Sequence, residues 1–311
     1  MADLENPVFQ NAELARELLE SIRWRTGVFC PHCAEAKAIT KLEGKSHRPG
    51  LYQCRSCREQ FTVTVGTVFE RSKIPLNKWL LATYLLSASK KGMSSHQLHR
   101  TLGVTYKTAW FMTHRIREAM KEGGFGLLGS GGGTVEVDET FWGNDQTIKP
   151  KGEKKGRGYH HKMKVLSLVE RDGKKRSFHV PAVNAVTLGP ILKAQIDASA
   201  SLMTDEAAVY TKVGRSFANH GVVVHSAGEY ARVTAGTLTS TNTVESSFAL
   251  LKRGLYGTFH HVGEQHLQRY VVEFDFRWNH RKTTDMERAV EVLRGIEGKR
   301  LTYRRIEEAS L

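Results

Sequence analysis

The feature that most constrains the fold is a pair of cysteine knuckles in the first sixty residues. Cys30 and Cys33 form one Cys-X-X-Cys pair, Cys54 and Cys57 form a second, and twenty residues separate the pairs. Two thiolates at this spacing hold one side of a tetrahedral ion, and a second pair completes the shell, as in zinc ribbons. Because four thiolates leave no open position, we expect a structural Zn²⁺ with His32 beside it. The alternative is four unrelated buried cysteines.

The charge balance points to a polyanionic partner. The 311 residues include 46 Lys and Arg against 32 Asp and Glu, which gives a net charge of +14. A surplus of this size is typical of proteins that bind nucleic acid. A membrane surface is the rival partner, but it normally requires an amphipathic basic helix or a lipidation site, and the sequence has neither.

The sequence also predicts a cytoplasmic location without membrane association. No apolar run approaches the roughly 20 residues that span a bilayer. The acidic start, Met1-Ala-Asp-Leu-Glu, lacks the basic residues and apolar stretch of a signal peptide. Thiols are reduced in the cytoplasm by default, so the four cysteines are expected as metal ligands rather than in disulfides.

Residues 93–119 have the pattern of a helix-turn-helix. Ser94 or Ser95 can cap a first helix, and Thr105 can cap a second. Gly103 permits the tight turn between the two helices. An ordinary helical hairpin is the alternative reading of the same pattern.

The start of the second helix would carry the residues that contact bases. Tyr106, Lys107 and Thr108 occupy this position, where a recognition helix meets base edges. Arg115 and Arg117 lie further along the helix and suit contacts with backbone phosphates.

Three acidic residues follow a glycine-rich stretch that we interpret as a linker. Asp138 ends or interrupts an alternating strand, Asp205 ends a second strand, and Glu245 lies one turn into a helix. Two carboxylates on neighbouring strands and a third from a crossing helix can hold two divalent ions about 4 Å apart. Mg²⁺ or Mn²⁺ suits such an all-oxygen site. Any one of these acids, taken alone, is more typical of a surface charge or a helix cap.

From Phe29 to about Arg281 the sequence resembles bacterial insertion-sequence transposases that join a zinc ribbon to a DDE catalytic domain, the ISXO-like group. The matching segments are long and specific. They are Cys54-Arg-Ser-Cys-Arg-Glu-Gln-Phe-Thr-Val, Gly66-Thr-Val-Phe-Glu, Lys73-Ile-Pro-Leu-Asn-Lys-Trp, Leu102-Gly-Val-Thr-Tyr-Lys-Thr-Ala-Trp, Val137-Asp-Glu-Thr, Asn242-Thr-Val-Glu and Arg269-Tyr-Val-Val-Glu-Phe-Asp-Phe-Arg-Trp-Asn-His-Arg.

The resemblance implies a multidomain α+β chain whose catalytic domain has an RNase H-like, mixed-sheet α/β fold. It implies a bacterial protein associated with the nucleoid through DNA. Together with the pattern of apolar residues and glycines along the chain, it predicts an N-terminal helix in residues 1–27, a zinc ribbon in 28–67, a helix-turn-helix region in 68–122, a linker in 123–133, the catalytic domain in 134–285 and a C-terminal helix and tail in 286–311.

The resemblance also implies roles for single residues. It carries Asp138, Asp205 and Glu245 over as ligands of two Mg²⁺ or Mn²⁺ ions. Lys252, seven residues after Glu245, shares its helix face and is expected to contact DNA beside the ions. Members of the group differ at the third acidic position, and some have Asn there, so Asn242 is expected to help shape the site.

A basic segment precedes the second half of the catalytic domain. From Lys149 to Lys164 there are seven basic residues and one acid, with three glycines among them. A DNA clamp that becomes ordered on DNA and a solvated basic loop are equally good interpretations. The candidate DNA contacts in this segment are Lys151, Lys154, Lys155 and Arg157.

These observations together predict a transposase. It would bind the terminal inverted repeats of an insertion sequence and catalyse strand cleavage and strand transfer on double-stranded DNA, both element ends and target. A homodimer or larger synaptic assembly is expected because two ends must be joined. The alternatives are a zinc-ribbon and helix-turn-helix regulator whose second half is inactive, and an RNase H-like nuclease or resolvase that only cuts.

Overall fold

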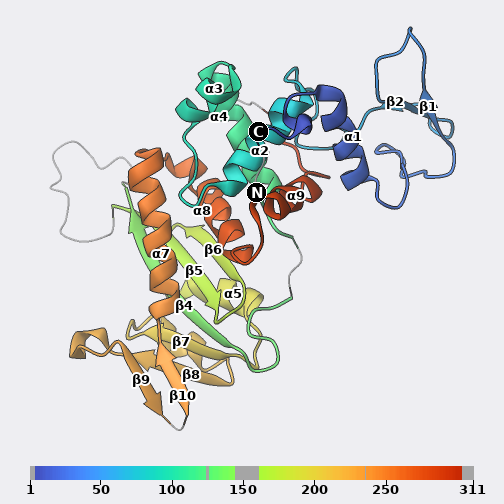
Figure 1. The fold of residues 1–311 in the computed structure, drawn as a ribbon. Coiled ribbons are helices and arrows are strands. Elements are labelled where there is room, and N and C mark those ends of the chain that lie inside the picture. Colours follow the sequence, from blue (N-terminus) through green and yellow to red (C-terminus); the bar gives the residue numbers. More distant parts are fainter. Residues whose placement is uncertain (1–3, 124–125, 144–160, 235, 303–311) are drawn as a thin grey trace. The chain divides into compact units, whose positions relative to one another are not determined.

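The computed structural model describes residues 4–123, 126–143, 161–234 and 236–302 (Figure 1). The chain divides into two compact units. The first, here called the helical unit, comprises Met1–Glu122 and Lys282–Leu311. The second, the sheet unit, comprises Gly123–Arg281. Among the described residues, no helix combines the length and apolar character needed to cross a bilayer.

The helical unit begins with a short helix pair and a small antiparallel sheet. Its elements are η1 (Pro7–Phe9), α1 (Ala12–Arg23), β1 (Ile39–Leu42), β2 (Leu51–Cys54) and β3 (Gln60–Phe61), with the strands in the order β1-β2-β3. Three rings hold the sheet against the end of α1. Trp24 meets Tyr52 and Phe61 edge-on, at centroid distances of 5.1 and 6.1 Å. Apolar rings, rather than a long sheet, therefore anchor this small subdomain.

The rest of the helical unit is a cluster of four helices. They are α2 (Leu76–Ala88), α3 (Ser95–Leu102), α4 (Tyr106–Ala119) and α9 (Asp285–Arg294). α2 is buried on most sides, with Trp79, Leu80, Tyr84 and Leu86 all at most 3% exposed. α9 comes from the end of the chain and packs against α2. The C-terminal helix therefore belongs to the same compact unit as the N-terminal half.

The sheet unit is built on a five-stranded mixed sheet. Its strands are β4 (Thr134–Trp142), β5 (Met163–Glu170), β6 (Lys175–Val180), β7 (Ser201–Asp205) and β8 (Asn219–Val223), in the order β6-β5-β4-β7-β8. β4, β5 and β6 pair antiparallel, whereas β4, β7 and β8 run parallel. The predicted multidomain α+β fold with a mixed sheet is confirmed.

Helices cover both faces of this sheet (Figure 1). The sheet unit also contains α5 (Ala185–Gln195), α6 (Tyr210–Gly214), η2 (His225–Ala227), the hairpin β9 (Ala231–Thr234) and β10 (Thr237–Ser240), α7 (Asn242–Gly254), η3 (Leu255–Phe259) and α8 (Glu264–Asn279). Apolar residues from α5 and α6 share a core with Val135 and Val137, on one face of β4. Residues of α7 and α8 form another core with Trp142 and Val165.

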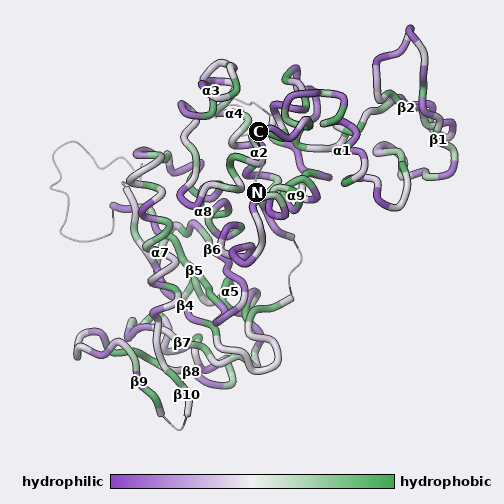
Figure 2. The backbone as a smooth tube through the Cα atoms, viewed as in Figure 1, coloured by the Kyte–Doolittle hydropathy of each residue, from purple (hydrophilic) through white to green (hydrophobic). Residues whose placement is uncertain are grey.

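The two cores explain why β5 is apolar along most of its length. Its first seven residues are all buried, and Figure 2 shows the green of apolar residues on the tube near its label. A central strand covered on both faces cannot alternate between polar and apolar residues. β4 does alternate at its start, because Val135 and Val137 face one core while Glu136 and Asp138 face α7.

The buried stripe of α1 is Ala15 and Leu19, and Leu14 is 38% exposed. Part of the expected linker is packed, because Leu128 is 2% exposed and a Cβ on Gly129 would lie 2.5 Å from that of Ala200. Glycine is therefore needed at position 129 for close packing as well as for its positive φ of 74°.

Candidate active site

The four cysteines form a compact cluster. Their sulfur atoms all lie within 4.8 Å of one another, with Cys30 and Cys57, and likewise Cys33 and Cys54, 3.6 Å apart. Zn–S bonds of about 2.3 Å in a tetrahedron place neighbouring sulfurs about 3.8 Å apart. The cluster therefore has both the chemistry and the size that a Zn²⁺ ion requires.

The two knuckles share one backbone geometry. The amide of Cys30 donates to the carbonyl of Glu35, and the amide of Cys54 donates to that of Glu59. In each turn the residue after the second cysteine is left-handed, with φ of 60° at Ala34 and 64° at Arg58. Neither residue is glycine, so both turns hold a conformation that L-residues disfavour.

The second candidate surface is the start of α4. Gly103 ends α3 with a φ of 59°, and the Thr105 hydroxyl accepts from the amide of Thr108, so the predicted turn and cap are present. Tyr106 is 45% exposed and Lys107 is exposed. The ring of Tyr106 stacks on His96 at 4.2 Å. The three residues expected to meet bases therefore occupy the accessible first turn.

The predicted phosphate contacts of Arg115 and Arg117 need correction. Arg115 is 8% exposed and donates to the carbonyls of Glu70 and Leu301. Arg117 is 1% exposed and donates to the Thr113 hydroxyl. The Arg115 guanidinium therefore ties α4 to other segments of the helical unit, and Arg117 is buried because the inward face of α4 continues to its last turn. The sequence predicts that both side chains face solvent, because arginines are rarely buried.

The carboxylates of the sheet unit meet at one edge of the sheet. The parallel pairing of β4 and β7 aligns Glu136 with Met203. Two residues further along each strand, the same register brings Asp138 level with Asp205. The side chain of Asp205 accepts from the amide of Ala207 at 3.0 Å, which fixes the turn after β7. Asp138, in the middle of β4, therefore lies beside Asp205, the last residue of β7.

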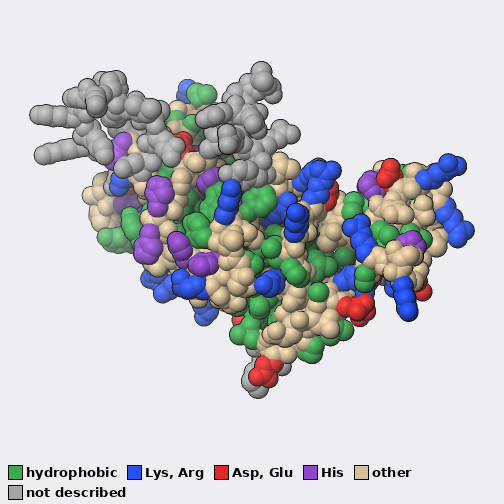
Figure 3. Space-filling model, turned by 90° about the horizontal axis from the view of Figure 1, so that it is seen from above, with side chains coloured by type: hydrophobic (Ala, Val, Ile, Leu, Met, Phe, Trp, Pro, Cys, Tyr) green, Lys and Arg blue, Asp and Glu red, His purple; other side chains and the backbone are tan. Residues whose placement is uncertain are grey.

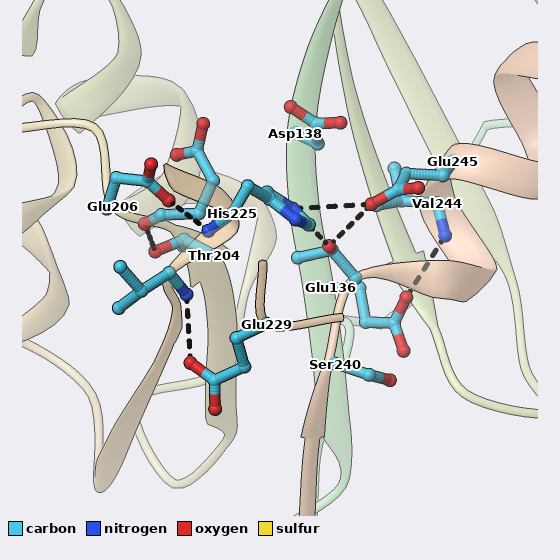
Figure 4. A network of polar contacts seen from close by, with 12 residues as sticks. Glu136, Asp138, Thr204, Glu206, His225, Glu229, Ser240, Val244 and Glu245 are labelled. Atoms are coloured by element: carbon cyan, nitrogen blue, oxygen red, sulfur yellow. Dashed lines mark hydrogen bonds and ion pairs between the residues drawn. The ribbon is translucent and has the colours of Figure 1, made fainter. Parts of the chain in front are cut away.

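Glu245 approaches this edge from the first turn of α7. Its Oε1 accepts from the Thr241 hydroxyl at 2.8 Å and lies 3.5 Å from Nε2 of His225. His225 follows β8, and its backbone amide donates to Glu206 at 2.7 Å. In Figure 4 the His225 ring reaches toward Glu245, with Asp138 drawn nearby on β4.

The environment of the edge disfavours negative charge. Burial, helped by the carboxylates of Asp205 and Glu245, raises the pKa of Asp138 to about 7, although the amide of Glu139 donates a hydrogen bond that lowers it. Burial likewise raises the pKa of Glu139 to about 7, although Tyr210 donates a hydrogen bond to it. Clustered, partly buried acids of this kind require a compensating cation or proton.

The three acids have the oxygen donors that a divalent ion needs, but their ligand atoms are not yet close enough together to surround one. Carboxylate oxygens are the donors that Mg²⁺ and Mn²⁺ prefer. Among the described residues, however, only the four cysteines form a group of three or more His, Cys, Asp or Glu whose ligand atoms lie within 4.8 Å of one another. Like charges repel, so the three carboxylates are expected to converge fully only around a cation.

Comparisons with known proteins agree on one family. Residues 130–279 match the ISXO2-like transposase domain, and residues 10–60 match the transposase zinc-ribbon domain. A protein in transposable element ISH50 of Halobacterium salinarum is 31% identical over 284 residues, which cover 86% of this chain and 91% of that protein. The chain belongs to the ISXO2-like transposase family. The resemblance read from the sequence motifs is thereby confirmed.

Other residues assigned to this transposase by sequence lie in different settings. Lys252 is half-buried in the last turn of α7, and Asn242 is exposed at its first position. The candidate contacts Lys151, Lys154, Lys155 and Arg157 lie outside the described residues. Figure 3 shows more Lys and Arg than Asp and Glu side chains, in keeping with the net charge of +14.

Sequence reasoning missed three residues beside the three candidate acids. Glu136 is fully buried and accepts from the first turn of α7, Arg171 pairs with it, and His225 contacts Glu245. A signal existed only for Glu136, which shares the alternating face of β4 with Asp138. Arg171 and His225 reach the edge through tertiary folding, which spacing along the chain does not report.

Proposed function

We propose that this transposase binds the terminal inverted repeats of an insertion sequence and catalyses DNA strand cleavage and strand transfer. The observation that carries the proposal is the alignment of Asp138 with Asp205 on adjacent parallel strands, with Glu245 presented from the start of α7. Membership in a transposase family supplies the substrate class. An RNase H-like catalytic domain is part of the same proposal.

Asp138, Asp205 and Glu245 would hold two Mg²⁺ or Mn²⁺ ions. When bound, such ions activate the attacking oxygen and stabilise the leaving oxygen of an in-line displacement at phosphorus. The protein contributes position. Two ligands come from paired strands, whose backbone is fixed by the sheet, and the third comes from a helix whose first turn is anchored to β4.

Neighbouring side chains hold the third acid and the DNA. The Thr241 hydroxyl donates to Glu245, and His225 lies against the same carboxylate oxygen. Lys252 follows Glu245 by two helical turns, so its ammonium group can contact a phosphate next to the acids. These groups would orient the ligand and the backbone of the DNA before the displacement begins.

End recognition is assigned to the helical unit. Tyr106, Lys107 and Thr108 would contact bases from the start of α4. The zinc ribbon would add phosphate contacts, and the basic segment 149–164 would act as a clamp on DNA. A homodimer or larger synaptic assembly is proposed because strand transfer brings two element ends together.

The test is a cleavage and joining assay on labelled DNA that carries the sequences flanking this gene. In Mg²⁺, Asp138→Asn, Asp205→Asn and Glu245→Gln should each lower both activities by more than about a hundredfold, since a misplaced reacting oxygen loses most of the rate. Binding of end DNA should stay within about twofold of the parent, because the acids hold ions rather than DNA. Asp172→Asn, in the exposed β5–β6 turn, is the matched control.

Other outcomes assign the alternatives. A parent protein that binds ends but never cleaves would be a regulator, and one that cleaves without joining would be a nuclease or resolvase. Asn242→Ala tests the third ligand. If that variant is inactive in Mg²⁺ and Mn²⁺ while Glu245→Gln still cleaves, Asn242 replaces Glu245 in the site.

A further inference from the structure

The first turn of α7 is capped in an unusual way. A helix N-terminus exposes four backbone amides, which the side chain of the preceding residue normally helps to satisfy. That residue is Thr241, and its side chain makes no capping hydrogen bond. Its hydroxyl donates instead to Glu245, at 2.8 Å. The helix that carries the proposed third ligand therefore needs another acceptor for its first amides.

Glu136 supplies that acceptor from the adjacent strand. Its carboxylate accepts from the amides of Thr243 and Val244, at 2.7 and 3.0 Å, and from the Thr243 hydroxyl at 3.0 Å. Figure 4 shows the contact from Val244 to Glu136 directly behind Glu245. A carboxylate at this end of a helix also interacts favourably with the helix dipole. Glu136 itself is 0% exposed.

Arg171 balances this buried charge and fixes the chain that enters α7. Its Nε lies 2.7 Å from the Glu136 carboxylate. Its two terminal nitrogens donate to the carbonyls of Leu238 and Ser240 and to the Ser240 hydroxyl. Leu238 and Ser240 belong to β10, which leads directly into the helix. One guanidinium group therefore ties β10, β4 and the start of α7 together.

This network spans the distance between two of the proposed metal ligands. Glu136 and Asp138 lie two residues apart on the same face of β4, and Glu245 follows Val244 directly. We propose that Glu136, held by Arg171, is a positioning residue that sets Glu245 relative to Asp138. The inference rests on the proposed function, because it assumes that both acids bind the same ions.

A buried ion pair that only stabilises the fold is the simpler explanation, and the same unit offers a matched example. Asp275 on α8 is 8% exposed and accepts from the amide and hydroxyl of Ser177, at 2.6 and 2.7 Å. Lys175 lies 3.5 Å from it. This pair joins α8 to β6 and, among the described residues, makes no hydrogen bond or ion pair with Asp138, Asp205 or Glu245. A variant of this pair therefore shows what a loss of stability alone does, without any change in the position of Glu245.

The experiment measures Mn²⁺ binding to the full-length chain, from the electron paramagnetic resonance signal of free Mn²⁺, together with thermal unfolding. Glu136→Gln should weaken Mn²⁺ binding about 10- to 100-fold, the range typical of residues that orient metal ligands. Asp275→Asn should lower the unfolding temperature but leave Mn²⁺ binding within about twofold. Thr243→Ala is the second variant, for use if Glu136→Gln fails to fold. It removes the hydrogen bond from the Thr243 hydroxyl to Glu136 and should weaken Mn²⁺ binding by a smaller factor.

The outcomes separate this inference from the proposed function. If Glu136→Gln and Thr243→Ala bind Mn²⁺ like the parent while Glu245→Ala does not, the positioning role is wrong and the proposed site stands. An equal loss in Asp275→Asn and Glu136→Gln would also overturn it, since stability alone would explain both. If Glu245→Ala binds Mn²⁺ like the parent, the proposed function itself fails.

Discussion

Replacing a proposed catalytic ligand should make the ion-free protein more stable. Burial and two neighbouring carboxylates raise the pKa of Asp138 from 3.8 to about 7, so the fold disfavours the ionised form. Asp138→Asn keeps the shape and an acceptor for the amide of Glu139 but removes the charge. The variant should therefore be inactive yet more stable, as is common at functional sites.

The size of the expected gain in stability follows from how far the pKa of Asp138 is raised, and it depends on pH. Below pH 3.8 the Asp138 carboxyl is protonated in both the folded and the unfolded chain, so its raised pKa does not lower the free energy of unfolding. Above that pH the loss of stability grows until the pH passes about 7. At about 1.4 kcal/mol for each pH unit, the full cost is about 4 kcal/mol at pH 8 and under 2 kcal/mol at pH 5. Because part of the side chain reaches water, the expected gain at pH 8 is about 2–4 kcal/mol.

The assay is hydrogen exchange of peptides from β4 and β5 in the full-length chain with EDTA, which reports the stability of the sheet unit alone. A gain of this size slows exchange about 30- to 1,000-fold at pH 8 and much less at pH 5, after correction for the intrinsic rate. Asp197→Asn is the control of opposite sign, because amide and hydroxyl donors from Ser199 lower the pKa of Asp197 and its ionised form stabilises the fold. Faster exchange in Asp138→Asn, or an equal gain at both pH values, would show that the ionised Asp138 carboxylate does not destabilise the fold.

Three further predictions concern the helical unit. Cys57→Ser, or a strong chelator, should unfold the ribbon and release about one zinc per chain, measured with a chromogenic chelator, because thiolate coordination and folding are coupled. Ala34→Gly should raise the stability of the ribbon by about 1 kcal/mol, seen as a higher urea concentration for zinc release, since glycine adopts a φ of 60° without strain. Lys107→Ala and Tyr106→Ala should reduce discrimination between end and random DNA in titrations at several salt concentrations, whereas Arg117→Ala should instead lower the unfolding temperature.

What could be predicted from the sequence is what depends on spacing along the chain. The two cysteine pairs lie in tight turns, so their spacing alone predicts the cluster of sulfur atoms. The cap at Thr105 and the glycine at position 103 likewise depend on local rules, and both are present. Asp138, Asp205 and Glu245 came from strand ends, a helix start and a family resemblance, and they stay a proposal.

What could not be predicted depends on tertiary contacts. Arg115 and Arg117 face inward because the buried face of α4 extends to its last turn, which the polarity of an arginine argues against. Glu136 caps a helix more than one hundred residues away in the chain. A search of the sequence for a capping residue next to this helix finds Thr241, but the Thr241 hydroxyl donates to Glu245 instead. Long-range polar networks therefore need the structure.

Three carboxylates, from β4, β7 and α7, should form one ion-binding site. The most direct test is anomalous X-ray diffraction from crystals of the full-length protein grown with Mn²⁺ and end DNA. We expect anomalous peaks about 2.0–2.2 Å from carboxylate oxygens of Asp138, Asp205 and Glu245, with one ion shared by at least two of these residues. Peaks held by Asn242 or Glu139 in place of Glu245, or no peak at this edge of the sheet, would contradict it.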